Sequence, residues 1–230
     1  MMKTGFELIV TTLLRRKLPY QNAQEEIGRL INLSMLKDHD LKERHKKNGY
    51  KFYAFNNLYP IEPSGIYQKG KLYIFRLRAV QESFVKKIKF CLTNLSNDTF
   101  QVIASEIHKF HPEFITMLYT VTPVIVTIDS SPFFPEGNLT LLKERLETNA
   151  EKKYKELFLK EPSSTNFIER IEVINRNPTV TCYKNMTYLG NKLKVFIRSD
   201  DVSQTLARIV ASAGLGEKSS SIGAGFCFVY

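Results

Sequence analysis

The sequence lacks tryptophan altogether, and it has only three cysteines and four histidines among its 230 residues. The cysteines, Cys91, Cys182 and Cys227, are odd in number and far apart, so they predict neither a disulfide framework nor a zinc site. Long apolar runs are also missing. The first apolar stretch, residues 6–14, is too short to cross a bilayer, and its basic residues follow it in an order wrong for a signal peptide. We therefore expect a cytoplasmic protein that does not associate with membranes.

Clusters of metal ligands are equally scarce. His108 and His111 stand three residues apart, and Glu106 precedes them. Two histidines at this spacing rarely form a metal site without a further ligand. The aspartates fall at expected turns and helix caps, which does not predict a Mg²⁺ site. We expect neither a metal ion nor a cofactor.

Positive charge is what the sequence has in excess. Lysine and arginine number 33 against 23 aspartates and glutamates, which gives a formal net charge of +10. This balance favours a polyanionic partner such as a nucleic acid. The hydrophobic fraction of 43% is ample for a globular core.

Glycines mark the C-terminal part of the chain. Two Gly-x-Gly pairs, Gly214/Gly216 and Gly223/Gly225, flank a serine-rich centre that contains Lys218. Glycine permits positive φ and close backbone approach, and such a loop can turn its N–H groups outward to bind an anion. A helix is expected before these glycines and a strand after them, the reverse of a P-loop or dinucleotide fingerprint. The alternative interpretation is a flexible helix-to-strand turn.

Hydrophobic periodicity predicts an α+β fold of two tandem ferredoxin-like (βαββαβ) halves, 1–112 and 113–230, joined near His111-Pro112. In the first half we expect strands at 6–14, 51–55, 72–79 and 99–107, a helix capped by Asn22, and a helix at 80–94. In the second half we expect strands at 117–128, 168–174, 193–198 and 226–230, and helices at 139–158 and 200–212. A further hairpin is expected to pair 179–188 with 191–198 through a turn at Gly190-Asn191.

His45 lies within a strongly basic segment, residues 42–51. Neighbouring cations disfavour its protonated form, and a phosphate bound beside it would do the opposite. A histidine near its titration point can act as a general acid or base, and Lys51 could stabilise developing negative charge. Cleaving RNA through its own 2′-OH needs an aligned 2′-OH, a proton acceptor, a proton donor and a cation, and His45 and Lys51 can supply two of these roles. The alternative is a solvated basic segment without chemistry.

Other basic residues predict an RNA-binding surface. Arg76 and Arg78 alternate with apolar residues along an expected strand, so they should project to one face. The remaining candidates are the neighbours of His45, the basic residues of the second half and the glycine-rich segment, namely Lys46, Lys47, Lys192, Lys194, Gly214, Gly216, Lys218, Gly223 and Gly225. Each of the basic side chains could equally belong to a solvated face.

These motifs resemble those of the CRISPR-associated endoribonucleases that cut precursor CRISPR RNA, the Cas-six family of the RAMP superfamily. The likeness rests on GLGEKSSSIGAGF at 214–226, Leu18-Pro19-Tyr20, Thr122-Pro123-Val124-Ile125-Val126 and the segment from His45 to Lys51. In that family two Gly-hydrophobic-Gly pairs flank a short basic spacer. Here the spacer is one residue longer, and Ala224 is smaller than usual.

The resemblance implies a tandem ferredoxin-like RAMP fold and a metal-independent endoribonuclease that leaves a 2′,3′-cyclic phosphate and a 5′-OH. It implies that His45 is catalytic and that Gly49 and Lys51 follow it in the family pattern. Some members add a tyrosine in the first helix, where this chain reads Leu30-Ile31-Asn32, so His39 and Tyr53 are the auxiliary candidates.

The implied partner is CRISPR repeat RNA, as a single strand or a hairpin. Whether the protein is a monomer or a homodimer stays open, as does binding to other subunits of a CRISPR interference complex. The alternative function is a non-catalytic RNA-binding subunit of a CRISPR ribonucleoprotein, which would need neither His45 nor Lys51.

Overall fold

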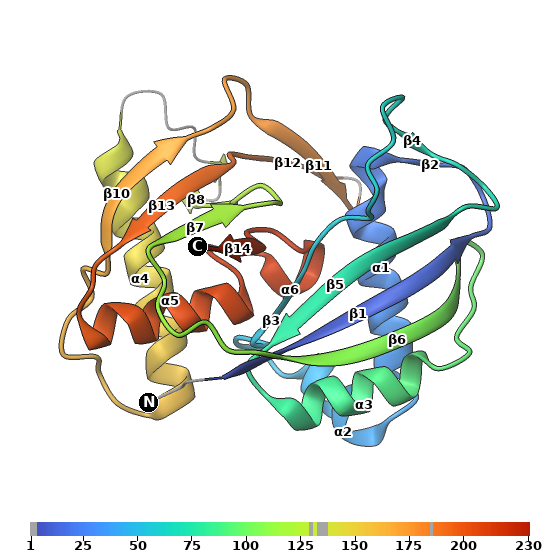
Figure 1. Ribbon diagram of the computed structural model, residues 1–230, viewed down its shortest axis with the longest axis horizontal. Coiled ribbons are helices and arrows are strands. Elements are labelled where there is room, and N and C mark those ends of the chain that lie inside the picture. The colour runs from blue at the N-terminus through green and yellow to red at the C-terminus, as the bar shows by residue number, and fades with distance from the viewer. Residues whose placement is uncertain (1–3, 129–130, 133–137, 185) are drawn as a thin grey trace.

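Two βαββαβ halves lie side by side in the computed structural model, which describes residues 4–128, 131–132, 138–184 and 186–230 (Figure 1). Each half has a four-stranded antiparallel sheet, and the two helices of its motif pack on that sheet. The predicted α+β fold with tandem ferredoxin-like halves is therefore confirmed. The first half ends with a strand at Phe110 and the second begins with one at Met117, and we propose the boundary within this connection.

The first half contains β1 (Gly5–Leu14), α1 (Tyr20–Met35), β3 (Tyr53–Phe55), β5 (Leu72–Ala79), α3 (Glu82–Leu92) and β6 (Phe100–Phe110). Its sheet order is β3-β5-β1-β6. Three short elements are added to the motif: α2 (His39–Lys46), β2 (Leu18–Pro19) and β4 (Ile66–Tyr67). Alternate residues of the central strand β1, including Leu8 and Val10, are fully buried with Ile27 and Leu30 of α1 and Ile88 of α3. This alternation is why the strand was visible in the sequence.

The second half repeats the pattern with β7 (Met117–Thr120), α4 (Leu139–Phe158), β10 (Ile168–Val173), β13 (Leu193–Ile197), α5 (Asp201–Ala213) and β14 (Cys227–Val229). Its sheet order is β10-β13-β7-β14. The added elements are β8 (Thr127–Ile128), β9 (Ser131–Pro132), β11 (Thr179–Tyr183), β12 (Met186–Gly190) and α6 (Ser219–Ile222). None of the described helices of the chain is long and apolar enough to cross a membrane.

Two predicted boundaries are wrong for reasons that involve proline. The first helix begins at Tyr20 rather than after Asn22, because Pro19 occupies the N-cap position with extended backbone and no side-chain cap is needed. The strand expected at 117–128 ends at Thr120, since Pro123 has no N–H to continue the ladder. The Thr122 hydroxyl instead donates to Gly223 O at 2.6 Å.

The predicted hairpin through Gly190-Asn191 is also wrong. The strand β12 pairs with β11, and Gly190 lies opposite Thr179 at the end of that ladder. A Cβ at Gly190 would stand 2.6 Å from the backbone oxygen of Val124, so glycine serves a close backbone approach here. A glycine in a turn and a glycine at a close backbone contact look the same in the sequence, so the sequence did not distinguish the two.

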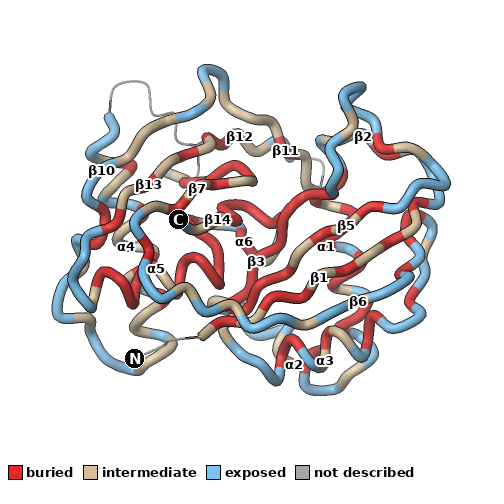
Figure 2. Tube along the Cα trace, in the orientation of Figure 1, coloured by how far each residue is buried: buried red, intermediate tan, exposed pale blue. Residues whose placement is uncertain are grey.

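Buried polar contacts join the two halves. The Arg78 side chain, only 5% exposed, pairs with Glu7 at 2.7 Å and donates to the carbonyl oxygen of Cys227 at 2.5 Å. Its guanidinium also lies over the rings of Phe110 and Phe226. Figure 2 shows that most of α5 and much of the glycine-rich segment are buried, in contrast to the outer surfaces. The C-terminal part of the chain therefore forms much of the joint.

Candidate functional site

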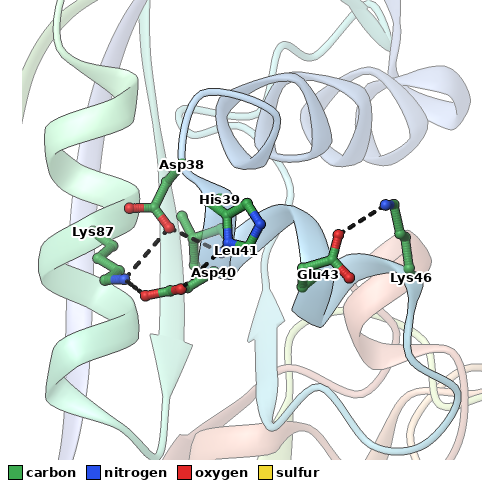
Figure 3. Close-up of polar contacts among 7 residues, drawn as sticks. All are labelled: Asp38, His39, Asp40, Leu41, Glu43, Lys46 and Lys87. Carbon is green, nitrogen blue, oxygen red and sulfur yellow. Dashed lines mark hydrogen bonds and ion pairs between the residues drawn. The ribbon is translucent and has the colours of Figure 1, made fainter.

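The basic segment belongs to α2 and to the connection that follows it. Asp38 caps α2 by accepting a hydrogen bond from Leu41 N at 2.9 Å, and Leu41 is the one buried residue of this helix. Lys87 of α3 binds both Asp38 and Asp40 (Figure 3). Leu41, these ion pairs and Arg44, which lies over the Phe84 ring and donates to Gln81, hold α2 on the first half. His45 and Lys46 at its end are exposed.

His45 lies in the last turn of α2 and is exposed. Within the described part of the chain, no hydrogen bond or ion pair engages its side chain. His39 is the first residue of the same helix and lies 3.7 Å from Asp40. His45 follows His39 by six positions, which is about 9 Å along the helix axis, so α2 does not bring the two histidines together.

Lys51 closes the C-terminal end of α2. Its Nζ donates to the carbonyl oxygen of Arg44 at 2.7 Å and to that of Lys47, while Arg44 donates to Lys51 O at 2.6 Å. A cation at a helix C-terminus is favourable because the carbonyl oxygens there have no helical partner. Burial, and secondly the charge of Arg44, lower the pKa of Lys51. Two of the three ammonium N–H groups are used, so one is left for a ligand.

Two hollows flank the stretch from Tyr50 to Phe52. The first, about 540 Å³, lies between α2 and the start of α3 and includes Lys47 and Lys51. The second, about 330 Å³, lies between the connection before β3, α4 and the glycine-rich segment. Its charged lining consists of four lysines and one glutamate, namely Lys51, Lys152, Lys153, Lys218 and Glu217. We call it the cationic hollow, and its lining is suited to a phosphate group.

The residues that α4 contributes to the cationic hollow were not predicted from the sequence. Lys153 is 2% exposed, and burial lowers its pKa to about 7. The stripe of buried apolar residues on α4, which includes Leu146 and Ala150, continues to Lys153 rather than to Tyr154. The spacing of that stripe is the signal that could have identified a buried lysine, because three and four residues are both helical neighbours.

The glycine-rich segment, residues 214–225, is built differently from the expectation. Its four glycines all have positive φ and are buried, and a Cβ at Gly225 would stand 1.8 Å from Leu215 O. Backbone N–H groups that the prediction placed outward donate within the protein instead: Leu215 N to Gly225 O, Glu217 N to Ile125 O, Gly223 N to Ser219 O and Gly225 N to Pro123 O. Lys218 is the one exposed residue of the segment. The glycines therefore serve packing, and these four amides point inward rather than outward, while the RNA contacts expected of the segment stay a prediction.

The remaining candidates are scattered. Arg78 lies in the joint between the halves, so its predicted RNA contact does not fit its burial. Arg76 pairs with Glu7 and lines a separate hollow of about 490 Å³ together with Lys192. Tyr53 is 2% exposed, stacks on Phe84 with 5.1 Å between ring centroids, and has its pKa raised by burial.

Outside these hollows, Lys194 lies on β13 and Lys46 pairs with Glu43 at 2.8 Å (Figure 3). Among the residues that the structure describes, no three histidine, cysteine, aspartate or glutamate side chains gather as a metal site.

Comparison with known proteins gives a consistent set of similarities, although no protein-family model matches the chain. The CRISPR-associated endoribonuclease Cas6 2 of Methanocaldococcus jannaschii is 28% identical over 214 residues, covering 84% of this chain and 86% of that protein. A solved RAMP protein described as binding different RNA substrates has a TM-score of 0.78 at 18% identity, with 98% of this chain and 99% of that one covered. A Cas6-related protein from Pyrococcus furiosus has a TM-score of 0.75 at 17% identity, with 98% of both chains covered.

The distant solved structures establish the fold, and the relative from Methanocaldococcus jannaschii extends the likeness to the sequence over most of the chain. The chain is thus similar in sequence to a CRISPR-associated endoribonuclease Cas6 and shares the fold of solved Cas6 and RAMP proteins.

Proposed function

We propose that the chain is an endoribonuclease that cleaves CRISPR repeat RNA in a precursor transcript without a metal ion. The observation that carries the proposal is the exposed His45 at the end of α2, six positions before Lys51, which lines the cationic hollow with three further lysines. The similarity to a CRISPR-associated endoribonuclease and to an RNA-binding RAMP protein supports the same reaction and the same partner.

The proposed reaction uses the RNA's own nucleophile. The 2′-oxygen attacks the adjacent phosphorus, the bond from phosphorus to the 5′-oxygen breaks, and the products are a 2′,3′-cyclic phosphate and a 5′-OH. His45 is the principal proton-transfer residue, because imidazole can both accept and donate a proton near neutral pH. The unused N–H of Lys51 would stabilise charge on the phosphate oxygens while its other two fix the end of α2.

Single-turnover cleavage of the host's repeat RNA, in the presence of a chelator, tests this function. His45→Ala should lose about 10²–10⁴-fold in rate, the usual contribution of general acid–base catalysis, with little change in RNA affinity. Lys51→Ala should slow cleavage and weaken binding modestly, since it removes a permanent charge from the hollow. His108→Ala is the matched control, because His108 is an exposed histidine on β6, paired with Glu106 at 3.4 Å and outside the hollows.

The outcomes separate the two classes of function. Cleavage by the wild type and near-normal cleavage by His45→Ala would remove His45 from its role, and His39→Ala would be tested next. Binding of repeat RNA by the wild type without any cleavage would favour the non-catalytic RNA-binding subunit.

A further inference from the structure

One face of α4 contacts both walls of the cationic hollow. Asn149, Lys153 and Glu156 are four and three residues apart, so they lie on the same side of the helix. Asn149 Nδ2 donates to the Tyr50 hydroxyl at 3.2 Å, and Glu156 Oε1 accepts from Tyr50 N at 3.2 Å. A helix of the second half therefore fixes the residue next to Lys51 in the first half.

Lys153 reaches the opposite wall from the same face. Its Nζ donates to the carbonyl oxygens of Gly214 at 2.6 Å and Gly216 at 3.0 Å, the first glycine pair. The same ammonium lies 5.6 Å from the centroid of the Tyr50 ring. One buried side chain thus contacts both the glycine-rich segment and the connection that carries Lys51.

A lysine in this place is costly, because burial disfavours an ammonium group unless it is paired. A helix can pack against a loop through apolar residues alone, as α4 does at Leu142 and Leu146. The two glycines whose carbonyl oxygens converge on Nζ, Gly214 and Gly216, both adopt positive φ, which favours glycine there. The glycine pair and the lysine are therefore parts of one arrangement.

We propose that Lys153 is a positioning residue, which holds the glycine-rich segment and the Tyr50–Lys51 edge in the spacing that receives the scissile phosphate. This inference rests on the proposed endoribonuclease function. Asn149 and Glu156 assist Lys153 by holding Tyr50 in place through their hydrogen bonds. The role is distinct from that of Lys51, because Lys153 acts through the two walls and donates its two hydrogen bonds to protein carbonyl oxygens.

The test compares Lys153→Met with Lys155→Met in the full-length protein. Methionine retains the length and apolar stem of Lys153 but donates to neither carbonyl. Lys155 is on the same helix, pairs with Glu151 and Glu161, and contacts neither wall. Lys153→Met should slow single-turnover cleavage by about 10²-fold, as expected for a misplacement of about 1 Å, with a much smaller loss of RNA affinity. Lys155→Met should behave as the wild type.

Hydrogen exchange without RNA gives a readout that does not depend on cleavage. In Lys153→Met, the amides of Leu215 and Glu217 should exchange about tenfold faster or more, the equivalent of one charge-assisted hydrogen bond. Ile88→Ala in the first-half core is the control for general destabilisation. In this variant the exchange rates of the two amides should change only as far as its free energy of global unfolding does.

Wild-type exchange at both amides in Lys153→Met, or equal losses of rate and affinity, would overturn the positioning role. If the wild type does not cleave repeat RNA at all, the proposed function fails, and the exchange result still decides whether Lys153 fixes the segment.

Discussion

The end of α2 and the glycine-rich segment are built in opposite ways, although the connection that follows α2 lines the cationic hollow together with that segment. His45 is exposed, and its helix contains a single buried residue, Leu41. The glycines at 214, 216, 223 and 225 are buried, and there is no room for a side chain at any of them. The first region provides chemical groups, whereas the second provides close backbone contact.

This difference shows that a conspicuous glycine motif can serve backbone packing. Glycine is required at these positions because adjacent backbones leave no space. An ideal Cβ at Gly223, for example, would stand 2.4 Å from Phe55 O. The less conspicuous residues Tyr50 and Lys153 line the hollow directly. Substitutions in the joint should therefore change stability, and substitutions at the end of α2 should change rate.

The largest effect on stability should come from Arg78→Met. It leaves Glu7 without its buried partner and removes the donor to Cys227 O, so the free energy of unfolding should fall by about 3–5 kcal/mol. Arg76→Met is the matched control, because Arg76 pairs with the same carboxylate but has a side chain that is 34% exposed. Denaturant unfolding of both variants measures the difference, and equal losses would mean that Arg78 is not the joint residue we describe.

A smaller loss is expected from Gly225→Ala, and it can be separated into two causes. Gly225 and Gly65 have nearly the same φ, +67° and +69°, but an added Cβ meets Leu215 O at 1.8 Å only at Gly225. Gly225→Ala and Gly65→Ala should each lower the free energy of unfolding by about 1–2 kcal/mol, because alanine is strained in the left-handed conformation. Gly225→Ala should lose about 1–3 kcal/mol more for overpacking. Equal unfolding free energies would contradict the packing role of the segment.

Local periodicity made most of the fold predictable. The helix α4 has the predicted bounds, because its apolar residues recur at helical spacing over twenty residues. The alternation of Leu8 and Val10 likewise identified β1. The failures lie where one residue type has two structural uses, as at Gly190, or where proline changes a boundary, as at Pro123.

The candidate site was only partly predictable, because burial depends on partners that are distant in the sequence. Arg76 and Arg78 look equivalent in the sequence, and only the pairing of β1 with β5 places Arg78 opposite Glu7. In the sequence, Lys153 is one of several lysines in a charged helix. Only the fold shows that the glycine-rich segment covers it. By contrast, His45 and Lys51 stand out through local charge, and their roles stay a proposal.

Lys153 should make the free energy of unfolding depend on pH. Its pKa is about 7 in the folded protein, against about 10.4 for an ordinary lysine, so the unfolded chain binds more protons between these values. The free energy of unfolding should therefore rise with pH by roughly 1.4 kcal/mol per unit over this range from this group. The groups facing it are Tyr50, Glu217 and Cys227.

The useful window for this measurement is pH 7 to 9. Burial raises the pKa of Cys227 to about 12, so the folded state keeps a proton that the unfolded thiol loses above about pH 8.5, and this effect opposes that of Lys153. The wild type should gain stability across the window relative to Lys153→Met. If the free energy of unfolding changed with pH in the same way for the two proteins, the pKa of Lys153 would not be lowered in the folded state.

The smallest effect should come from Lys218, the exposed cation of the otherwise buried segment. Its side chain lines the cationic hollow and lies 5.8 Å above the Tyr188 ring, so it can contact a phosphate without holding the fold together. Lys218→Ala should weaken RNA binding and reduce the slope of log affinity against log salt by about 0.7, one single-strand phosphate contact. Lys109→Ala, on the far edge strand β6, should leave the slope unchanged. Binding titrations at several salt concentrations measure both slopes, and an unchanged slope for Lys218→Ala would leave the glycine-rich segment with a packing role alone.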